Sequence, residues 1–530
     1  MRRSVRASAA TPALLVIVLL ATPLGAQGTA TRTPAGSAAG ASVAPVPKVP
    51  AAMRFIREAD LSRDLYAMAS DAMNGREAGT LDEMKASMWV ADEMRKIGLT
   101  PKGESDSWFQ WFNMRRTRLS SVSSSVTLGG RTMALWTEIT PTSNAAVDVS
   151  AATVFVGDGR DTTVDVRGKI AVATLTPPTA ALRSTTNTYE YRYARQAITA
   201  QGAMLARRGA AGVILVADSV ADIAYDGVWK LQSRGTYDVL GGVPRFSQNA
   251  GGRGAGGGGA PQQAPAPVLF VRRAMLSQLR TDGQLVDIKL RAESFEYPSV
   301  NIIGVVPGTD PTLRNEYVVF SSHQDHDGGR FAVAGDSIWN GADDNGTTSV
   351  ALLAIARAWV KQPSKRSALF IFHGAEERGL LGSRYHAAHP VVPLTQMAAV
   401  LNGDMIGRNH PDTAALLGSQ PPHRNSVELV QMAIDANRAT GKFVIDSLWD
   451  RPTHPEGWYF RSDHVPYAER NVPSLFFSSN LHPDYHTPRD EPKNIDYPKL
   501  TRITQWMYMT GWLAANASKR PALDEGFKLR

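Results

Sequence analysis

The sequence predicts an α/β protein built around a mostly parallel sheet flanked by helices. Four short, continuous apolar runs from residue 316 onward suit strands that are buried on both faces, as parallel strands are. Stretches with helical periodicity separate these runs, for example TSVALLAIARAWV, which is expected to be capped near Thr347 or Thr348. The chain has 530 residues, 43% of them hydrophobic and 20% charged, which predicts two or three globular domains.

The first 50 residues are expected to lie outside the fold. Residues 1–26 place three arginines before the apolar run ALLVIVLLA and the small-residue stretch PLGAQG, as in a secretory signal peptide cleaved after Ala26. Residues 27–50 are rich in Ala, Thr, Pro and Gly and predict a flexible linker. No later apolar run approaches the roughly 18 residues of a membrane span, so we expect a periplasmic or secreted protein without a stable membrane anchor.

Composition excludes several classes of function. The chain has no cysteine, which excludes a lipoprotein anchor, disulfides and thiol chemistry. The net charge is +8, but the basic residues are scattered, and part of the excess belongs to the signal peptide. Nucleic acid is therefore not an expected partner.

The N-terminal and middle segments differ in texture. Residues 51 to about 118 are expected to be helical, with Gly98 as a probable C-cap, because apolar side chains recur at spacings of three and four: Met84, Met88, Val90, Ala91, Met94 and Ile97. Residues 140–289 alternate strand-like runs such as AGVILVAD with one helical stretch, ITAQGAMLARRGA. The Gly-rich segment 249–267 is expected to form a mobile surface loop.

Polar side chains follow the predicted parallel strands at the point where each strand ends. EYVVFSSH leads into His323 and Asp325, SALFIFHGAE into Glu376 and Glu377, and AAVLNGD into Asp404. A fourth run, PSLFFSSN, precedes the segment that contains His486. Because functional sites in open α/β sheets form beyond the carboxyl ends of strands, we expect these side chains to converge.

The residue types at this edge suit a metal site. Imidazoles and carboxylates without thiolates favour zinc or a similar divalent ion in a hydrolytic site. Five candidates give three ligands to each of two metals if Asp344 is shared: His323, Asp344, Glu377, Asp404 and His486. Sharing explains why NGADDNG carries two adjacent aspartates, since one of them would face two cations. Glu376, beside a ligand, is placed to act as a general base.

Five motifs in this part of the chain resemble those of the co-catalytic zinc aminopeptidase family, in order and rough spacing: SSHQDHDG, NGADDNG, GAEERGLLGS, NGDMIGR and YHTPRDE. That family includes secreted bacterial leucine aminopeptidases, glutamate carboxypeptidase and glutaminyl cyclase. The resemblance covers about residues 51–135 and 290–515. It implies a zinc peptidase domain formed by residues 51–139 and 290–520.

The resemblance also implies a role for each site residue. Asp344 would bridge two zinc ions, with Glu377 and His486 completing one site and His323 and Asp404 the other. Glu376 would be the general base, Asp325 would orient the His323 imidazole, and Tyr485 would polarise the scissile carbonyl. Cobalt or manganese would suit the same ligands.

Other histidines are expected to play lesser parts. His482 is a rival to His486, which the family pattern favours. His464 is expected in a loop near the cleft, and His326 and His373 are expected to support the ligands from outside or to pack. The remainder are expected to be surface or structural residues: His386, His389, His410, His423 and His454.

The inserted segment 140–289 resembles a protease-associated domain. The leading hypothesis is a secreted zinc-dependent exopeptidase that acts on peptides, and specifically an aminopeptidase. Alternatives are a carboxypeptidase of the glutamate carboxypeptidase type, which needs a basic pocket, and a glutaminyl cyclase, a one-zinc enzyme that does not need His323. A non-catalytic binding module is disfavoured because all five ligands and Glu376 are present.

Overall fold

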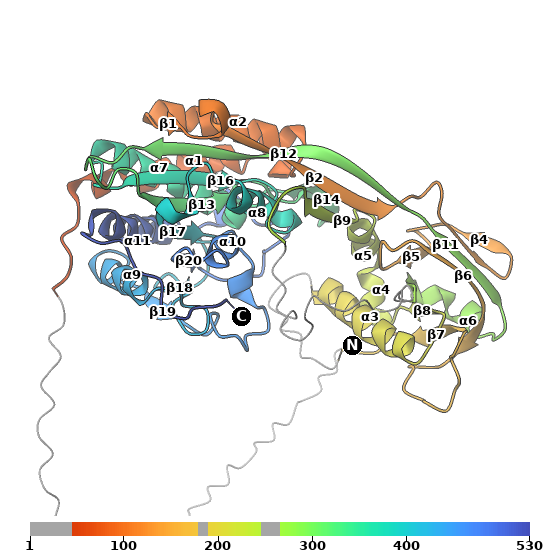
Figure 1. Ribbon diagram of the computed structural model, residues 1–530. Helices are drawn as coiled ribbons and strands as arrows, with labels where there is room; N and C mark the ends of the chain where they lie inside the picture. The colour runs from red at the N-terminus through yellow and green to blue at the C-terminus, as the bar shows by residue number, and fades with distance from the viewer. Residues whose placement is uncertain (1–44, 179–188, 245–265, 530) are drawn as a thin grey trace, which may run out of the picture. The chain divides into compact units, whose positions relative to one another are not determined.

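A computed structural model describes residues 45–178, 189–244 and 266–529. The predicted signal peptide, most of the linker and most of the Gly-rich loop fall outside these ranges, so the predictions made for them stay predictions. Two large sheets contain most of the described strands. Figure 1 shows the helices that accompany them.

The larger sheet contains the four predicted parallel strands at its centre. Their order is β20–β17–β13–β16, and each neighbouring pair is parallel. Toward one edge lie β12, β2 and β9, all antiparallel, with β1 paired to β12, and toward the other lie β18 and β19. The bounds are β1 Thr100–Pro101, β2 Phe109–Leu119, β9 Thr236–Val239, β12 Ala292–Val306, β13 Tyr317–His323, β16 Ser367–His373, β17 Met397–Gly403, β18 Thr413–Leu417, β19 Val444–Asp446 and β20 Ser474–Ser478.

Helices cover both faces of this sheet. Alternate residues of β13 face different layers, since Phe320 belongs to one hydrophobic cluster and Val319 to another. The Phe320 side packs against α1 (Glu58–Met68), α2 (Leu81–Ile97), α7 (Thr348–Lys361), α9 (Val427–Ala439) and α11 (Tyr497–Asn516). The Val319 side packs against α8 (Leu381–Ala388) and α10 (Val465–Ala468). Burial on both faces explains why the central strands are continuously apolar.

The prediction of helix over residues 51–118 is only partly right. The α1 and α2 helices form there, and Gly98 ends α2 in the left-handed region, with its N–H donating to Met94 and Arg95 carbonyls. Residues 109–119, however, form strand β2, along which Gln110, Phe112 and Met114 are buried at every second position. The pairing of β2 with β12 decided this segment, and β12 lies far away in sequence.

A second sheet draws its strands from residues 125–290. Its order is β4–β3–β11–β6–β7–β8–β10–β5. The bounds are β3 Ser125–Leu128, β4 Arg131–Met133, β5 Ile139–Pro141, β6 Val147–Phe155, β7 Ile170–Thr174, β8 Gly212–Val216, β10 Val268–Val271 and β11 Leu285–Leu290, with helices α3 Tyr189–Arg207, α4 Ser219–Ile223, α5 Tyr225–Gln232 and α6 Leu276–Leu279. The predicted strands and helix of this segment are present. The domain boundaries and the protease-associated identity stay predictions.

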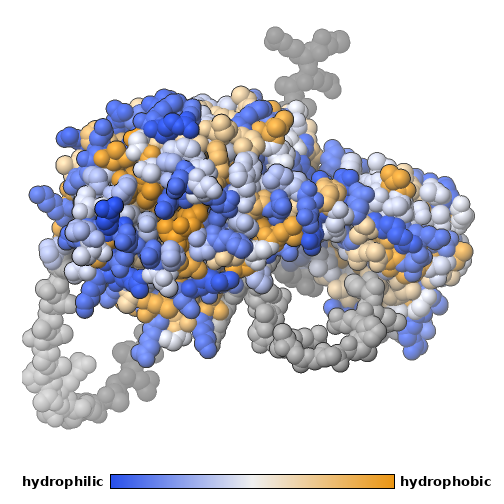
Figure 2. Space-filling view, turned by 45° about the horizontal axis from the view of Figure 1, so that its top comes forward, coloured by the Kyte–Doolittle hydropathy of each residue, from blue (hydrophilic) through white to orange (hydrophobic). Residues whose placement is uncertain are grey.

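The rest of the described chain adds a short hairpin of β14 (Gly328–Val333) and β15 (Asp336–Trp339). Among the described residues, no helix is both long enough and apolar enough to cross a membrane. The face shown in Figure 2 is mostly hydrophilic, with apolar residues in small separate patches.

Candidate metal centre

Three adjacent parallel strands deliver polar residues to one edge of the larger sheet. Strand β13 ends at His323, β17 ends directly before Asp404, and β16 is followed closely by a 3-10 turn, Glu376–Arg378. Because these strands run in the order β17–β13–β16, their carboxyl ends are neighbours. The convergence expected from the strand ends is therefore present.

The adjacent aspartates of NGADDNG face different partners. The Asp344 carboxylate places Oδ1 3.3 Å from His323 Nε2 and Oδ2 3.0 Å from His486 Nε2. The Asp343 carboxylate instead accepts the N–H of Gly407 at 2.7 Å and so holds the loop that follows Asp404. Asp344 therefore belongs to the candidate site, and Asp343 stabilises the neighbouring backbone.

The predicted ligands fall into two groups that share Asp344. In the first, His323 Nε2 lies 3.5 Å from Asp404 Oδ2. In the second, His486 Nε2 lies 3.1 Å from Glu377 Oε1. His326, expected to pack or to support the ligands from outside, also lies in the second group.

The atoms of these groups have the properties of metal ligands. Among the described residues, several of their buried atoms have no hydrogen-bond partner: His323 Nε2, His326 Nδ1, Glu377 Oε1, Asp404 Oδ1 and His486 Nε2. Buried polar atoms are normally paired, because an unpaired one costs about 1–3 kcal/mol. A divalent ion in each group would supply the missing partner for imidazole and carboxylate donors alike. The residues therefore fit the metal that their types predict.

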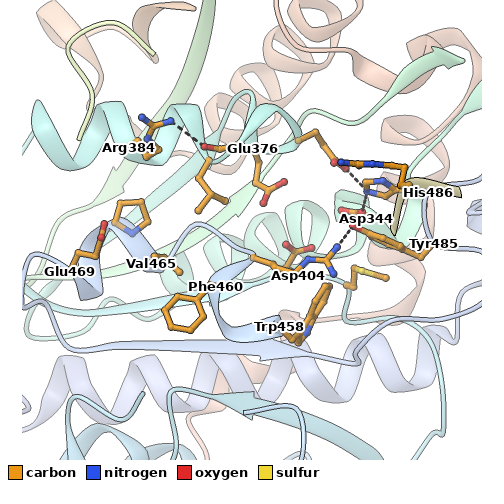
Figure 3. Close-up of a pocket in the computed structure, with 17 residues that line it drawn as sticks. Asp344, Glu376, Arg384, Asp404, Trp458, Phe460, Val465, Glu469, Tyr485 and His486 are labelled. Carbon is orange, nitrogen blue, oxygen red and sulfur yellow. Dashed lines mark hydrogen bonds and ion pairs between the residues drawn. The ribbon is translucent and has the colours of Figure 1, made fainter. Parts of the chain in front are cut away.

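Glu376 adjoins the ligands but belongs to neither group. Its carboxylate lies 3.8 Å from His323 Nε2 and faces the pocket in Figure 3. Burial, together with the neighbouring Glu377 and Asp404 carboxylates, raises the pKa of Glu376 well above its usual value, although His323 opposes the shift. A buried carboxylate that can take up a proton is what a general base requires.

Asp325 contacts the site differently from the prediction. The hydrogen bond to His323 Nδ1 comes from the backbone carbonyl of Asp325, at 3.1 Å, while its carboxylate Oδ1 lies 3.8 Å away. The carboxylate accepts the backbone N–H groups of Glu376 at 2.9 Å and Glu377 at 3.3 Å. Asp325 thus orients the His323 imidazole through its backbone carbonyl. Its side chain fixes the backbone of Glu376 and Glu377.

A pocket of about 410 Å³ opens beside both groups. Tyr485 lines it, and its hydroxyl accepts a hydrogen bond from Arg461 Nη2 at 2.8 Å. Arg461 also donates a hydrogen bond to Glu456 at 3.0 Å, so Glu456 fixes the guanidinium that positions the phenol. The opposite part of the pocket is mixed, with the apolar Phe460 and Val465 in its wall together with Glu469 and Arg384 (Figure 3).

Two supporting residues had no role assigned from the sequence. Arg76 is fully buried and donates to the carbonyls of Gln324 at 2.7 Å, Asn340 at 2.6 Å, Gly341 at 2.8 Å and, outside the site, Met68 at 3.1 Å. Its positive charge lies beside the two loops that carry His323 and Asp344. Asp490 accepts the backbone N–H groups of both NGADDNG aspartates at 2.9–3.1 Å. Arg76 lies far from the motifs along the chain, which is why its role was missed. Asp490 lies within the YHTPRDE motif, but its contact with the aspartates is not visible in the sequence.

The remaining histidines lie outside both groups. His482, the rival to His486, places Nε2 3.4 Å from Asp343 Oδ2 rather than beside a ligand. His464 is buried and packs edge-on against Tyr459. His373 is buried near Tyr467, whose hydroxyl lies 3.3 Å from its Nε2.

Comparison with known proteins agrees with the fold and with the family resemblance of the motifs. Residues 301–510 match Peptidase family M28. Aminopeptidase YwaD of Bacillus subtilis is 25% identical over 463 residues, which cover 85% of this chain and 84% of that protein. A probable leucine aminopeptidase 2 of Aspergillus oryzae is 30% identical over 197 residues, which cover 36% of this chain and only 35% of that protein. The part of the chain that carries both ligand groups therefore resembles Peptidase family M28, and the chain is a metallopeptidase.

Solved structures share the fold over most of the chain. The aminopeptidase of Aneurinibacillus sp. strain AM-1 gives a TM-score of 0.53 at 18% identity, covering 90% of this chain and 98% of its own. A zinc aminopeptidase of Bacillus subtilis, BSAP, gives a TM-score of 0.53 at 21% identity, covering 91% of this chain and 100% of its own.

Proposed function

We propose that this protein is a zinc-dependent aminopeptidase that removes N-terminal residues from peptides and holds two metal ions. The observation that carries the proposal is the Asp344 carboxylate, whose two oxygens face His323 in one ligand group and His486 in the other. Asp404 and Glu377 complete the groups. Bound zinc supplies Lewis acidity and lowers the pKa of coordinated water. Cobalt or manganese suits the same ligands.

Glu376 is proposed as the proton carrier of the reaction. It is the one pocket carboxylate beside the ligands that is not needed to hold an ion, and the Asp325 carboxylate fixes its backbone. Hydrolysis of a peptide bond requires a proton to leave the attacking water and to reach the leaving amine. A carboxylate at this position can accept the first proton and deliver the second.

Tyr485 is proposed to hold the scissile carbonyl. Arg461 donates to the phenol oxygen, which leaves the phenol O–H free to donate into the pocket. Burial, with Asp344 and Glu377 adding to it, raises the pKa of Tyr485 well above its usual value although Arg461 opposes the shift, so the hydroxyl stays protonated. A positioned O–H can stabilise the negative charge that develops on a carbonyl oxygen.

The electrostatics of the pocket support cleavage at the N-terminus. The Glu376 and Asp404 carboxyl groups lie beside the ligand groups, where they can accept hydrogen bonds from a substrate's α-ammonium group. The apolar Phe460 and Val465 in the pocket wall can accept the first side chain. Relatives named as aminopeptidases agree with this orientation.

The direction of cleavage is testable with one peptide in two forms. The zinc-loaded protein is incubated with a free pentapeptide and with the same peptide N-acetylated, and the products are identified by mass spectrometry. We expect N-terminal trimming of the free peptide and no cleavage of the acetylated one. Removal of the last residue from both forms would instead establish a carboxypeptidase.

The pocket offers limited support for that carboxypeptidase alternative. Three arginines line it, but Arg384 is paired with Asp238 at 2.7 Å and Arg461 with Glu456. Only Arg195, on α3, is without an ion pair among the described residues. Conversion of an N-terminal glutamine to pyroglutamate would favour the cyclase, which does not need the group formed by His323.

Metal dependence is the second test. Chelation is expected to abolish hydrolysis, and zinc or cobalt to restore it, with two ions per chain by elemental analysis. Full activity in protein holding well under one ion per chain would refute the proposal. We also propose that the protein is exported, on the strength of residues 1–26, and detection of the mature chain beginning after Ala26 outside the cytoplasm would support this.

A further inference from the structure

His326 lies three residues after His323, and its ring is fully buried beside the second ligand group. Its Nδ1 lies 2.8 Å from Glu377 Oε1 and 4.0 Å from Asp344 Oδ2. The ring stands edge-on to that of His486, with 5.3 Å between centroids and 84° between planes. Four side chains therefore surround one point in this group, against three in the other.

The close contact between His326 and Glu377 has the distance of an ion pair but lacks the direction of a hydrogen bond. Nδ1 and Oε1 are at hydrogen-bonding distance, yet neither has a hydrogen-bond partner among the described residues, and neither does His486 Nε2. The distance between Nδ1 and Oε1 is short enough, but the ring N–H does not point at the carboxylate oxygen, as a hydrogen bond requires. His326 Nδ1, Glu377 Oε1 and His486 Nε2 therefore lie close together without bonding one another, as ligands around a common centre do.

The backbone at Gly341 leaves room for the His326 ring beside the second group. A Cβ at Gly341 would come within 2.3 Å of His326 Cγ, so the ring occupies the space that any other residue at 341 would need. Gly341 has φ +57°, which glycine adopts without strain. The His326 N–H also donates to the Arg76 carbonyl at 3.2 Å. The fold thus keeps the His326 imidazole beside the second group, although an unpartnered buried nitrogen costs about 1–3 kcal/mol.

We propose that His326 Nδ1 is a further ligand of the ion held by Asp344, Glu377 and His486. The proposal rests on the proposed function, which assigns an ion to this group. The spacing of the four atoms suits it, because ligand bonds of about 2.1 Å place donors about 3–4 Å apart. A centre with four protein ligands is closed, whereas the centre of His323, Asp344 and Asp404 keeps an open position. The two centres then differ in affinity, and the group with His326 holds its ion more tightly.

X-ray absorption at the zinc edge counts the imidazoles directly. His323→Ala removes a ligand from the other group, so a single equivalent of zinc then occupies the group with His326. We expect two imidazoles per zinc in His323→Ala and one in His323→Ala/His326→Gln. One imidazole in both proteins would overturn the proposal. If these variants do not fold, fully loaded wild-type protein decides, with three imidazoles per two zinc ions expected and two contradicting the proposal.

Metal affinity gives an independent measurement. In competition with a chelator, His326→Gln is expected to weaken one of the two binding steps by about 10–100-fold or more and to leave the other nearly unchanged. His423→Gln is the matched control, because His423 is also buried but bonds Asp450 outside both groups. Equal affinities in the His326 and His423 variants would show that His326 only packs. Wild-type protein that retains no zinc would instead refute the proposed function and this inference with it.

Discussion

Replacing Arg76 tests whether the metal centre depends on a residue outside all of its motifs. Arg76→Met keeps an unbranched, flexible side chain, although a shorter one, and removes the charge and all donors. Four carbonyls lose a charge-assisted bond: those of Met68, Gln324, Asn340 and Gly341. At about 1.5–3 kcal/mol each, the gross loss is about 6–12 kcal/mol.

Relief of the buried charge offsets part of this loss. Burial lowers the pKa of Arg76 to about 10, although neighbouring acids such as Asp325 oppose the shift, so the guanidinium stays charged at neutral pH. Removing it spares a desolvation cost of several kcal/mol. We therefore expect a net destabilisation of about 3–5 kcal/mol, as for other broken buried pairs.

Two measurements separate a structural role from a role in the site. Chemical denaturation of metal-free protein gives the loss in unfolding free energy, and chelator competition gives the metal affinity of the folded protein. Arg366→Met is the matched control, since Arg366 is equally buried and donates to the carbonyls of Ala514 and Ala517 far from the ligands. We expect both variants to be destabilised and only Arg76→Met to bind metal more weakly. Equal metal affinities would refute the reasoning.

Three further predictions concern single side chains. Glu376→Gln is expected to lower kcat by about 10²–10⁴-fold with both ions retained, and loss of an ion instead would make Glu376 a ligand. Tyr485→Phe is expected to lower kcat by about 10²–10³-fold with little change in KM, whereas Tyr508→Phe, in the core, should leave kcat unchanged; equal effects would remove Tyr485 from the reaction. Burial raises the pKa of Glu83 from 4.5 to about 8, so the folded state keeps a proton that the unfolded state loses, and stability falls as pH rises from 4.5 to 8 by up to about 5 kcal/mol. Glu83→Gln should flatten that fall in chemical denaturation, and unchanged pH dependence would contradict it.

The elements that the sequence predicts correctly are those whose identity follows from the pattern of neighbouring residues. The central strands are buried on both faces and therefore read as continuous apolar runs, and α2 shows its period and its Gly98 cap. Strand β2 was misread as helix because its identity comes from pairing with β12, about 180 residues away. Membership of β9 in the larger sheet depends on the same distant partner, β2.

The same division runs through the site. The sequence by itself indicated that His323, Glu377 and Asp404 would gather, because strand ends of a parallel sheet meet at one edge. Only the tertiary structure decided that Asp325 bonds His323 through its carbonyl, that His326 faces the ligands, and that Arg76 lies beside their loops. These depend on the direction in which a side chain points and on contacts across some 250 residues, and neither is encoded in the spacing of residues along the chain.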